Sequence, residues 1–184
     1  MRVIAGTAKG TKLNSIDDLS TRPTLDRVKE PLFSIIQNNI YDSNVLDLFA
    51  GSGALGIETL SRGAKHCVFC DSSFKSINML KENILKTRMQ EKSTIISMDY
   101  KKCLDYQKEK FDIIFIDPPY KKDIAVDAIK RIISLKLLAE NAIIVLETDE
   151  EERELNELKE VKELEVFDKR KYGRIKLLFL CERG

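Results

Sequence analysis

The chain has 184 residues, of which 43% are hydrophobic and 33% charged, and its formal net charge at pH 7 is +1. This length suits one domain with a full core, and the apolar content argues against a disordered chain. No apolar run approaches the roughly 18–20 residues needed to cross a bilayer, and the first residues lack the apolar segment of a secretory signal. We therefore expect a single domain, residues 1–184, in the cytoplasm.

Residues 1–40 predict a small extension that precedes the main fold. Residues 2–13 have the pattern of a short hairpin with two glycines near its turn. A helical pattern follows over residues 21–40, with Thr24 as its N-cap and Pro31 as the site of a kink or a fresh start.

Residues 44–184 alternate short apolar runs with amphipathic stretches. This pattern predicts a parallel sheet with helices on both faces and right-handed crossovers between strands. The predicted strands are residues 44–49, 66–71, 93–98, 111–116 and 141–147. The predicted helices lie near residues 54–62, 73–86, 100–108 and 123–135.

The end of the chain changes character. Apolar runs near residues 161–168 and 174–181 flank a basic turn at Tyr172-Gly173, and no helical pattern separates them. They predict an antiparallel hairpin at the edge of the sheet. The expected fold is therefore α/β and Rossmann-like, with a doubly wound, mostly parallel sheet of seven strands.

The charges are unevenly distributed. Residues 147–165 carry ten acidic and three basic side chains, and we expect them to form a solvated helix and sheet edge. Two basic groups would form a footprint for an anionic polymer if they met in space, although an ordinary solvated surface explains them equally well. The groups are Arg2, Lys9, Lys12, Arg22, Arg27 and Lys29, and Lys169, Arg170, Lys171, Arg174 and Lys176.

The cysteines predict no metal centre. Cys67 and Cys70 lie three residues apart in a strand-like run, which puts their thiols on opposite faces. The only histidine of the sequence, His66, cannot complete a four-ligand site with them. We expect reduced, structural thiols and no bound metal.

A glycine turn follows the first predicted core strand. Gly51 to Gly56 satisfies the pattern G-x-G-x-x-G, and Asp71 follows Gly51 by 20 residues, which is also the spacing of a dinucleotide site. Asp47 favours another ligand, because a carboxylate four residues before the turn would repel a pyrophosphate. It would attract the amino and sulfonium groups of S-adenosylmethionine. A nicotinamide enzyme is the less favoured alternative.

Further residues complete the predicted cofactor site. Asp99 ends the third predicted strand, where it can accept a hydrogen bond from an adenine amine. Three acids at successive strand ends suit a cationic, adenosine-containing ligand, and a helix cap is the structural alternative for any one of them. The predicted cofactor-binding residues in this region are Asp47, Phe49, Gly51, Gly53, Asp71 and Asp99.

A second site follows the apolar run 111–116. Asp117 and the carbonyl of Pro118 provide acceptors for the N–H bonds of a nucleobase amine, so that the nitrogen lone pair can point at a donor methyl group. Pro118 and Pro119 fix the loop and place no competing N–H beside the amine. Tyr120 offers a face for a base flipped out of its stack. We predict that these four residues form the catalytic loop.

The carboxylate of Asp117 favours guanine, whose N1–H and N2–H are adjacent donors. Adenine instead places an N1 acceptor beside its N6 amine, and a carboxylate would repel that acceptor. An adenine-N6 methyltransferase acting on DNA or RNA remains an alternative, as does an RNA-binding assembly factor without catalytic activity.

Several motifs accompany the two turns. They are Arg2-Val3-Ile4-Ala5-Gly6 with Lys9-Gly10, Arg22-Pro23-Thr24 with Asp26-Arg27-Val28-Lys29-Glu30 and Leu32-Phe33, Leu46-Asp47, Gly51 to Gly56 with Glu58 and Leu60-Ser61-Arg62-Gly63, Asp117-Pro118-Pro119-Tyr120, and Tyr172-Gly173. With these motifs the chain resembles the RsmD-type 16S rRNA guanine-N2 methyltransferases of bacteria. The Arg-Pro-Thr segment is the most specific of them, because generic methyltransferases lack it.

The resemblance implies a class I methyltransferase fold and methyl transfer from S-adenosylmethionine to the exocyclic amine of a small-subunit rRNA guanine, with S-adenosylhomocysteine as product. The residues it places at the cofactor are Asp47, Gly51 and Gly53, with Asp71 on the ribose and Asp99 near adenine. Arg22 and Thr24 would close over the cofactor or the RNA, and the proline turn would hold the base. The implied partner is 16S rRNA, which we expect to be presented in a small-subunit particle.

Overall fold

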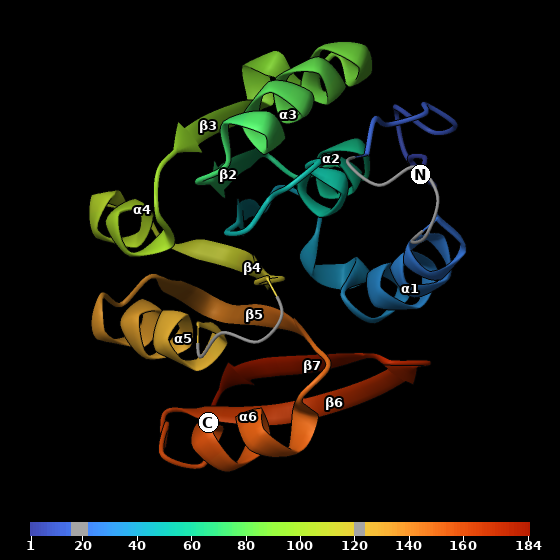
Figure 1. Cartoon of the computed structure of the whole chain (residues 1–184). Helices are drawn as coiled ribbons and strands as arrows, with labels where there is room; N and C mark the ends of the chain where they lie inside the picture. The colour runs from blue at the N-terminus through green and yellow to red at the C-terminus, as the bar shows by residue number, and fades with distance from the viewer. Residues whose placement is uncertain (16–21, 120–123) are drawn as a thin grey trace.

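The computed structural model of the chain describes residues 1–15, 22–119 and 124–184, with residues 22–27 described by their backbone alone. In these residues seven strands form one sheet in the order β3-β2-β1-β4-β5-β7-β6. Helices cover both faces of this sheet (Figure 1). The predicted α/β architecture with seven strands is confirmed.

The element bounds follow the apolar runs of the sequence. The strands are β1 Asn44–Asp47, β2 His66–Asp71, β3 Ser93–Ser97, β4 Phe111–Ile116, β5 Leu138–Thr148, β6 Leu164–Tyr172 and β7 Ile175–Glu182. The helices are α1 Arg22–Ile35, α2 Ala54–Ser61, α3 Phe74–Thr87, α4 Tyr100–Tyr106, α5 Ala125–Ser134 and α6 Glu151–Leu158, with short 3₁₀ turns at Gln37–Asn39 and Gln90–Lys92.

The strand order changes direction at β1. This strand pairs in parallel with β2 on one side and with β4 on the other. The chain moves outward from β1 to β2 and β3, and then returns to build β4 and β5 on the opposite side. Open α/β sheets bind ligands at such a switch point, beyond the carboxyl ends of the strands.

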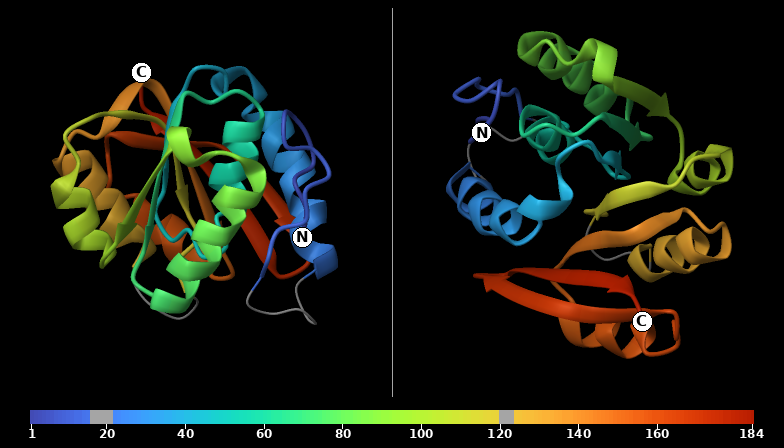
Figure 2. Two further views of the ribbon diagram at one scale, coloured as in Figure 1. Left: turned by 90° about the horizontal axis from the view of Figure 1, so that it is seen from above. Right: turned by 180° about the vertical axis from the view of Figure 1, so that it is seen from behind.

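Two apolar cores lie against the two faces of the sheet. One contains side chains of α1, α2 and α3, with Phe33 of α1 at 6.2 Å from Phe115 of β4 between ring centroids. The other contains side chains of α4, α5 and α6. Figure 2 shows the same division of the helices from two further directions. Because β4 is covered on both faces, its sequence is apolar apart from Asp112.

The last two strands turn the sheet antiparallel. β7 pairs antiparallel with β5 and with β6, so the predicted C-terminal hairpin is confirmed. Helix α6, which the acidic segment forms, connects β5 to β6 and lies beside the hairpin at this end of the sheet (Figure 1). Among the helices of the described residues, none has the length and apolar character needed to span a bilayer.

Two expectations for the start of the chain need correction. The helix begins at Arg22, so Thr24 lies inside its first turn and is not the N-cap. Pro31 lies within the same helix and marks no fresh start. A proline removes only one backbone donor, and packing of the apolar face of α1 holds the helix together across this gap. The expected hairpin at residues 2–13 is confirmed as a short one. Arg2 forms an antiparallel bridge with Lys12, and three backbone hydrogen bonds join the two arms: Val3 N to Thr11 O at 3.0 Å, Gly10 N to Val3 O at 2.9 Å and Leu13 N to Met1 O at 3.0 Å.

Cys67 and Cys70 lie on opposite faces of the sheet, as their spacing predicts. Cys67 lies in the core beneath α1 to α3, whereas Cys70 lies in the core beneath α4 to α6. The four thiols form no disulfide. In the described part of the chain, no group of His, Cys, Asp and Glu side chains suits a metal ion.

A buried acid on α2 fastens the N-terminal segment to the sheet. Glu58 is fully buried, and its two carboxylate oxygens accept hydrogen bonds from the backbone N–H groups of Ile4 at 2.8 Å and Ala5 at 3.0 Å. These contacts join residues more than fifty positions apart. They explain why this short N-terminal hairpin keeps a defined path over α2.

Two basic side chains neutralise the Glu58 carboxylate. Lys29 Nζ lies 2.8 Å from it and also donates to the Arg2 carbonyl at 3.1 Å, while Arg62 Nε lies 2.9 Å away. Burial alone would raise the pKa of Glu58, but the charge and hydrogen bonds of Lys29, with smaller contributions from Ile4 and Arg62, hold it below its ordinary value. Glu58 is therefore an ionised acid inside the protein.

Candidate functional site

Four acids stand where four neighbouring strands end. We call this side of the sheet the carboxyl edge, meaning the carboxyl-terminal ends of β1, β2, β4 and β5. Asp47 and Asp71 are the last residues of β1 and β2, Asp117 follows β4 directly, and Glu147 is the penultimate residue of β5. The register pairs Asp47 with Phe69 and Phe115, so the ends of these strands lie level with one another.

Asp47 is the most deeply buried of these four acids. Its side chain is 3% exposed, and its Oδ2 accepts a hydrogen bond from Gly56 N at 3.0 Å. Burial raises the pKa of Asp47 to about 7; the Gly56 hydrogen bond opposes this shift and the charge of Asp71 adds to it. A cation placed beside this carboxylate would restore its ordinary ionisation, so the position suits an ammonium or sulfonium group.

The glycine turn leaves open space at the carboxyl edge. Gly51 and Gly53 both have positive φ, +54° and +78°. A Cβ on Gly53 would lie 2.3 Å from Leu80 Cδ1, so this glycine is needed for packing. A Cβ on Gly51 would meet nothing within 4 Å, so this glycine borders a space that a ligand can approach closely.

Asp71 holds the glycine turn in place. Its Oδ2 accepts a hydrogen bond from Gly51 N at 2.8 Å, and its Oδ1 accepts one from Ser73 N at 2.8 Å. Each carboxylate oxygen has a second lone pair, so the side chain can still accept hydrogen bonds from a pair of ribose hydroxyls. The twenty-residue spacing therefore brings Asp71 directly onto the turn.

The third predicted acid has a structural task. Asp99 is exposed, and its Oδ1 accepts a hydrogen bond from Lys101 N at 2.9 Å, which caps α4. Next to it, the rings of Phe49 and Tyr100 are in contact, with centroids 5.5 Å apart. The Tyr100 hydroxyl is held by Asp127 at 2.6 Å. The two rings are tilted by 45°, and the partly exposed Phe49 ring provides an apolar surface near Asp99.

Asp117 lies half-buried on the far side of the switch point. Burial raises its pKa well above the ordinary value, and the charges of Glu147 and Asp47 raise it further. Asp117, at the start of the proline turn, therefore lies within electrostatic range of Asp47, which precedes the glycine turn. Pro118 is buried and Pro119 is exposed at the surface. Tyr120 lies outside the described residues, as do the side chains of Arg22 and Thr24.

Glu147 was missed by the sequence analysis, which treated it as the start of a solvated acidic segment. It is 7% exposed, and its charge acts on Asp117. A signal was available, because an acid at the end of an apolar run is the pattern that identified Asp47 and Asp71. The density of charge after Glu147 obscured it.

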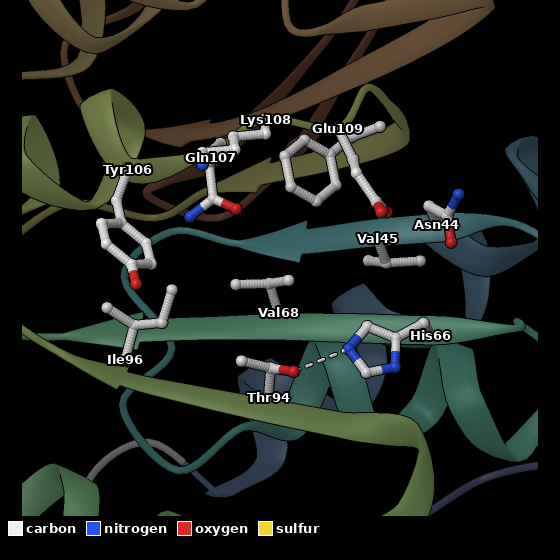
Figure 3. Close-up of a pocket in the computed structure, with 11 residues that line it drawn as sticks. Asn44, Val45, His66, Val68, Thr94, Ile96, Tyr106, Gln107, Lys108 and Glu109 are labelled. Carbon is white, nitrogen blue, oxygen red and sulfur yellow. Dashed lines mark hydrogen bonds between the residues drawn. The ribbon is translucent and has the colours of Figure 1, made fainter.

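A cavity of about 420 Å³ lies elsewhere, on one face of the sheet. Asn44, His66 and Phe111 line it, and each is the first residue of its strand, so the cavity adjoins the edge opposite the carboxyl edge. In Figure 3 the His66 ring points toward Thr94, with Nε2 and Oγ1 2.9 Å apart. None of the predicted catalytic or cofactor-binding residues lines this cavity.

Replacing Asp47 by asparagine is expected to stabilise the ligand-free chain at alkaline pH. Folding moves the pKa of Asp47 from 3.8 to about 7, so the folded chain keeps a proton that the unfolded chain has released. The stabilisation that comes from this retained proton is fully present below pH 3.8 and is lost as the pH rises to about 7. The variant should exceed the wild type by on the order of 2–4 kcal/mol at about pH 8.

Urea titration of both proteins at several pH values measures this difference. The difference should shrink steadily as the pH falls toward 4, where both side chains are neutral. A difference independent of pH, or a variant less stable at alkaline pH, would show that Asp47 keeps an ordinary pKa in the folded chain.

Comparison with known proteins places the whole chain among methyltransferases. Residues 1–181 match the family model described as "Conserved hypothetical protein 95". The chain is 37% identical to "Putative rRNA methyltransferase YlbH" of Bacillus subtilis, with all of both chains covered. It is 39% identical to "Ribosomal RNA small subunit methyltransferase D" of Haemophilus influenzae, covering 82% of this chain and 80% of that one. A solved "putative methylase" of Haemophilus influenzae superposes with a TM-score of 0.77 at 30% identity, covering 97% of this chain and 96% of that one.

Proposed function

Because this chain belongs to the Conserved hypothetical protein 95 family, which includes the RsmD-type methyltransferases, we propose that it transfers a methyl group from S-adenosylmethionine to the exocyclic N2 amine of a guanine in bacterial 16S rRNA. One observation carries the proposal. Asp117 and the turn at Gly51 share the carboxyl edge. The charge of Asp47 acts on Asp117, and Asp71 accepts a hydrogen bond from Gly51 N. A base held at one turn faces a donor held at the other.

The residues present fit S-adenosylmethionine. When bound, this cofactor supplies an electrophilic methyl group on a sulfonium. Asp47 would attract its cationic amino-acid end, and Asp71 would accept hydrogen bonds from its ribose hydroxyls. The open space at Gly51 would admit the chain between these two ends. A dinucleotide fits less well, because its pyrophosphate would meet the Asp47 carboxylate.

The adenine end has a weaker but consistent set of contacts. The Phe49 ring would lie against the face of the adenine, and the Asp99 carboxylate would accept a hydrogen bond from its amine. Asp99 can do this while it caps α4, since one oxygen accepts from Lys101 N and the other is free to accept elsewhere. Arg22 and Thr24 are proposed to close over the cofactor or the RNA.

Asp117 would act on the guanine amine. Its carboxylate and the Pro118 carbonyl accept the two N–H bonds of N2, which withdraws the nitrogen lone pair from the ring and directs it at the methyl group. The raised pKa of Asp117 makes its carboxylate a stronger proton acceptor. It therefore takes the proton that the nitrogen loses on methylation. Pro119 keeps the loop free of competing donors, and Tyr120 would stack on the base.

Product analysis tests this function. The protein is incubated with methyl-labelled S-adenosylmethionine and, in separate reactions, 16S rRNA, small-subunit particles from cells lacking this protein, and DNA. The nucleic acid is then digested to nucleosides. We expect label in N2-methylguanosine, with most of it in the reaction with particles. Label in N6-methyladenosine would overturn the guanine assignment, and no label in any reaction would overturn the enzymatic one.

A further inference from the structure

The C-terminal hairpin extends past the end of the sheet on the side of the proposed active site. β6 runs in the direction of β5, because each pairs antiparallel with β7. Thr148, the last residue of β5, is level with Lys176, whereas the hairpin continues to the pair Tyr172 and Ile175. The turn at Gly173 and Arg174 therefore projects beyond the carboxyl edge. Figure 2 shows this end of the hairpin beside α1.

The end of the hairpin that includes this turn is basic. Residues 169–176 include five lysines and arginines and no acid. Three of them, at the base, have acidic partners: Lys169 and Lys176 lie 3.9 and 3.6 Å from Glu151. Arg170 pairs with Asp168 at 2.9 Å.

The two basic residues at the tip differ from those at the base. Lys171 and Arg174 are exposed, and neither has an acidic partner among the residues that the structure describes. We call these two residues the hairpin tip. They carry two uncompensated positive charges at this end of the hairpin, with Arg174 in the turn itself and Lys171 opposite Lys176. Such charges attract an anionic polymer without first losing a salt bridge within the protein.

The hairpin tip is held in a fixed position. Tyr172 and Ile175, which flank the turn, pack against the core beneath α1 to α3. The turn between them has two residues, and Gly173 adopts φ +63°, as a tight hairpin turn requires. Two charges on an anchored turn lose little conformational freedom when they bind, so they can fix the orientation of a partner as well as attract it.

Lys9 of the N-terminal basic group lies elsewhere. Thr7 N donates to the Ser61 carbonyl at 2.8 Å, which places the loop that carries Lys9 at the last residue of α2. Helix α2 starts after the glycine turn at the carboxyl edge and ends before β2 begins, at the opposite edge. Lys29 is buried against Glu58 and cannot contact a partner. Neither lysine therefore shares a surface with the hairpin tip.

We propose that the hairpin tip binds RNA phosphates that flank the target guanine, and that Lys9, at the opposite edge, takes no part in this contact. The proposal rests on the proposed function, because it is the position of Asp117 that makes this edge the RNA-facing one. Phosphate contacts from Lys171 and Arg174 would position the strand, while the loop at Asp117 would select the base.

The test compares two double variants that lose equal charge. Lys171→Ala/Arg174→Ala removes the hairpin tip, and Lys9→Ala/Lys65→Ala removes two exposed lysines at the opposite edge, where Lys65 immediately precedes β2. Binding of fluorescein-labelled 16S rRNA is measured by anisotropy over a series of salt concentrations. Loss of two phosphate contacts should weaken binding roughly ten- to thirtyfold and reduce the slope of log K against log salt by roughly 1.4–1.8. The Lys9→Ala/Lys65→Ala variant should bind like the wild type.

A third variant separates charge from shape. Lys171→Arg/Arg174→Lys keeps both charges and should retain the affinity and the salt slope of the wild type. Calorimetry with S-adenosylmethionine should give one affinity for all these proteins. Equal loss in both alanine variants, or no change of slope in the tip variant, would overturn the proposal. These measurements do not depend on methylation, so a failure of the proposed reaction would be seen separately, in the nucleoside analysis.

Discussion

Replacing Asp117 by alanine is expected to lower the rate of methyl transfer to rRNA by roughly 10²–10³-fold, the range seen when one preorganised polar group that stabilises a transition state is removed. The variant loses the acceptor for one N–H bond of the amine and the group that receives its proton. Asp117 stands on the β4 side of the switch point, whereas the proposed cofactor contacts come from β1 and β2. Affinity for S-adenosylmethionine should therefore change little.

Two further variants make the Asp117 result specific. Asp117→Asn keeps the shape and one acceptor oxygen but takes no proton, so its rate should lie between those of the wild type and the alanine variant. Asp112→Ala removes a carboxylate from the opposite end of the same strand, where it accepts a hydrogen bond from Asn44 N at 2.7 Å. Single-turnover rates with saturating donor measure all three. Undiminished turnover in Asp117→Ala would contradict the proposed mechanism.

Replacing Glu58 by alanine is expected to reduce the free energy of unfolding by about 3–5 kcal/mol, the usual cost of removing one partner from a buried ion pair. Lys29, which is 1% exposed, would keep its charge without a carboxylate. The N–H groups of Ile4 and Ala5 would lose their acceptors at the same time. The N-terminal segment would then lose its attachment to α2.

Urea unfolding of matched variants isolates the buried pair. Glu160→Ala breaks the exposed pair with Lys130, 3.0 Å in length, and should cost less than about 1 kcal/mol. Glu58→Leu/Lys29→Met replaces both charges by apolar groups and should recover much of the loss. Since the pKa of Glu58 is lowered in the folded chain, its stabilising contribution should fade as acid protonates it. A Glu58→Ala variant as stable as Glu160→Ala would show that the buried pair of Glu58 and Lys29 contributes little to the free energy of unfolding.

The strands could be predicted well from the sequence because each core strand is covered on both faces. A strand such as β4 is apolar apart from Asp112, and its run of residues 111–116 ends where the fold ends it. The sequence pattern did not indicate that β7 pairs with β5, because the paired residues lie 28 to 36 positions apart in the chain. The helix start at Arg22 was also misjudged, because Thr24 has the chemistry of a cap without occupying that position.

The acids at the ends of β1, β2 and β4 could be located for the same reason, since an acid that follows an apolar run must lie at the carboxyl edge. Residue types alone did not separate their structural tasks from their proposed functional ones. Asp71 fixes the turn at Gly51, and Asp99 caps α4, through backbone groups that composition does not reveal.

Part of the family-specific pattern is structural. Lys29, Glu58 and Arg62 belong to the motifs on which the resemblance rests, yet they meet in a buried ion cluster rather than at the carboxyl edge. Their partners are as far as 54 residues away in the chain, so no local pattern could assign this role. The specificity of these motifs reflects how the N-terminal segment is attached.

A crystal structure of the chain with S-adenosylhomocysteine would show directly whether the cofactor and the Asp117 loop share one site. We expect the amino group of the product to lie beside Asp47, its ribose beside Asp71, and its sulfur to face Asp117 across the carboxyl edge. Density for the product in the cavity that His66 and Thr94 line, or at any site away from the ends of β1 and β4, would contradict it.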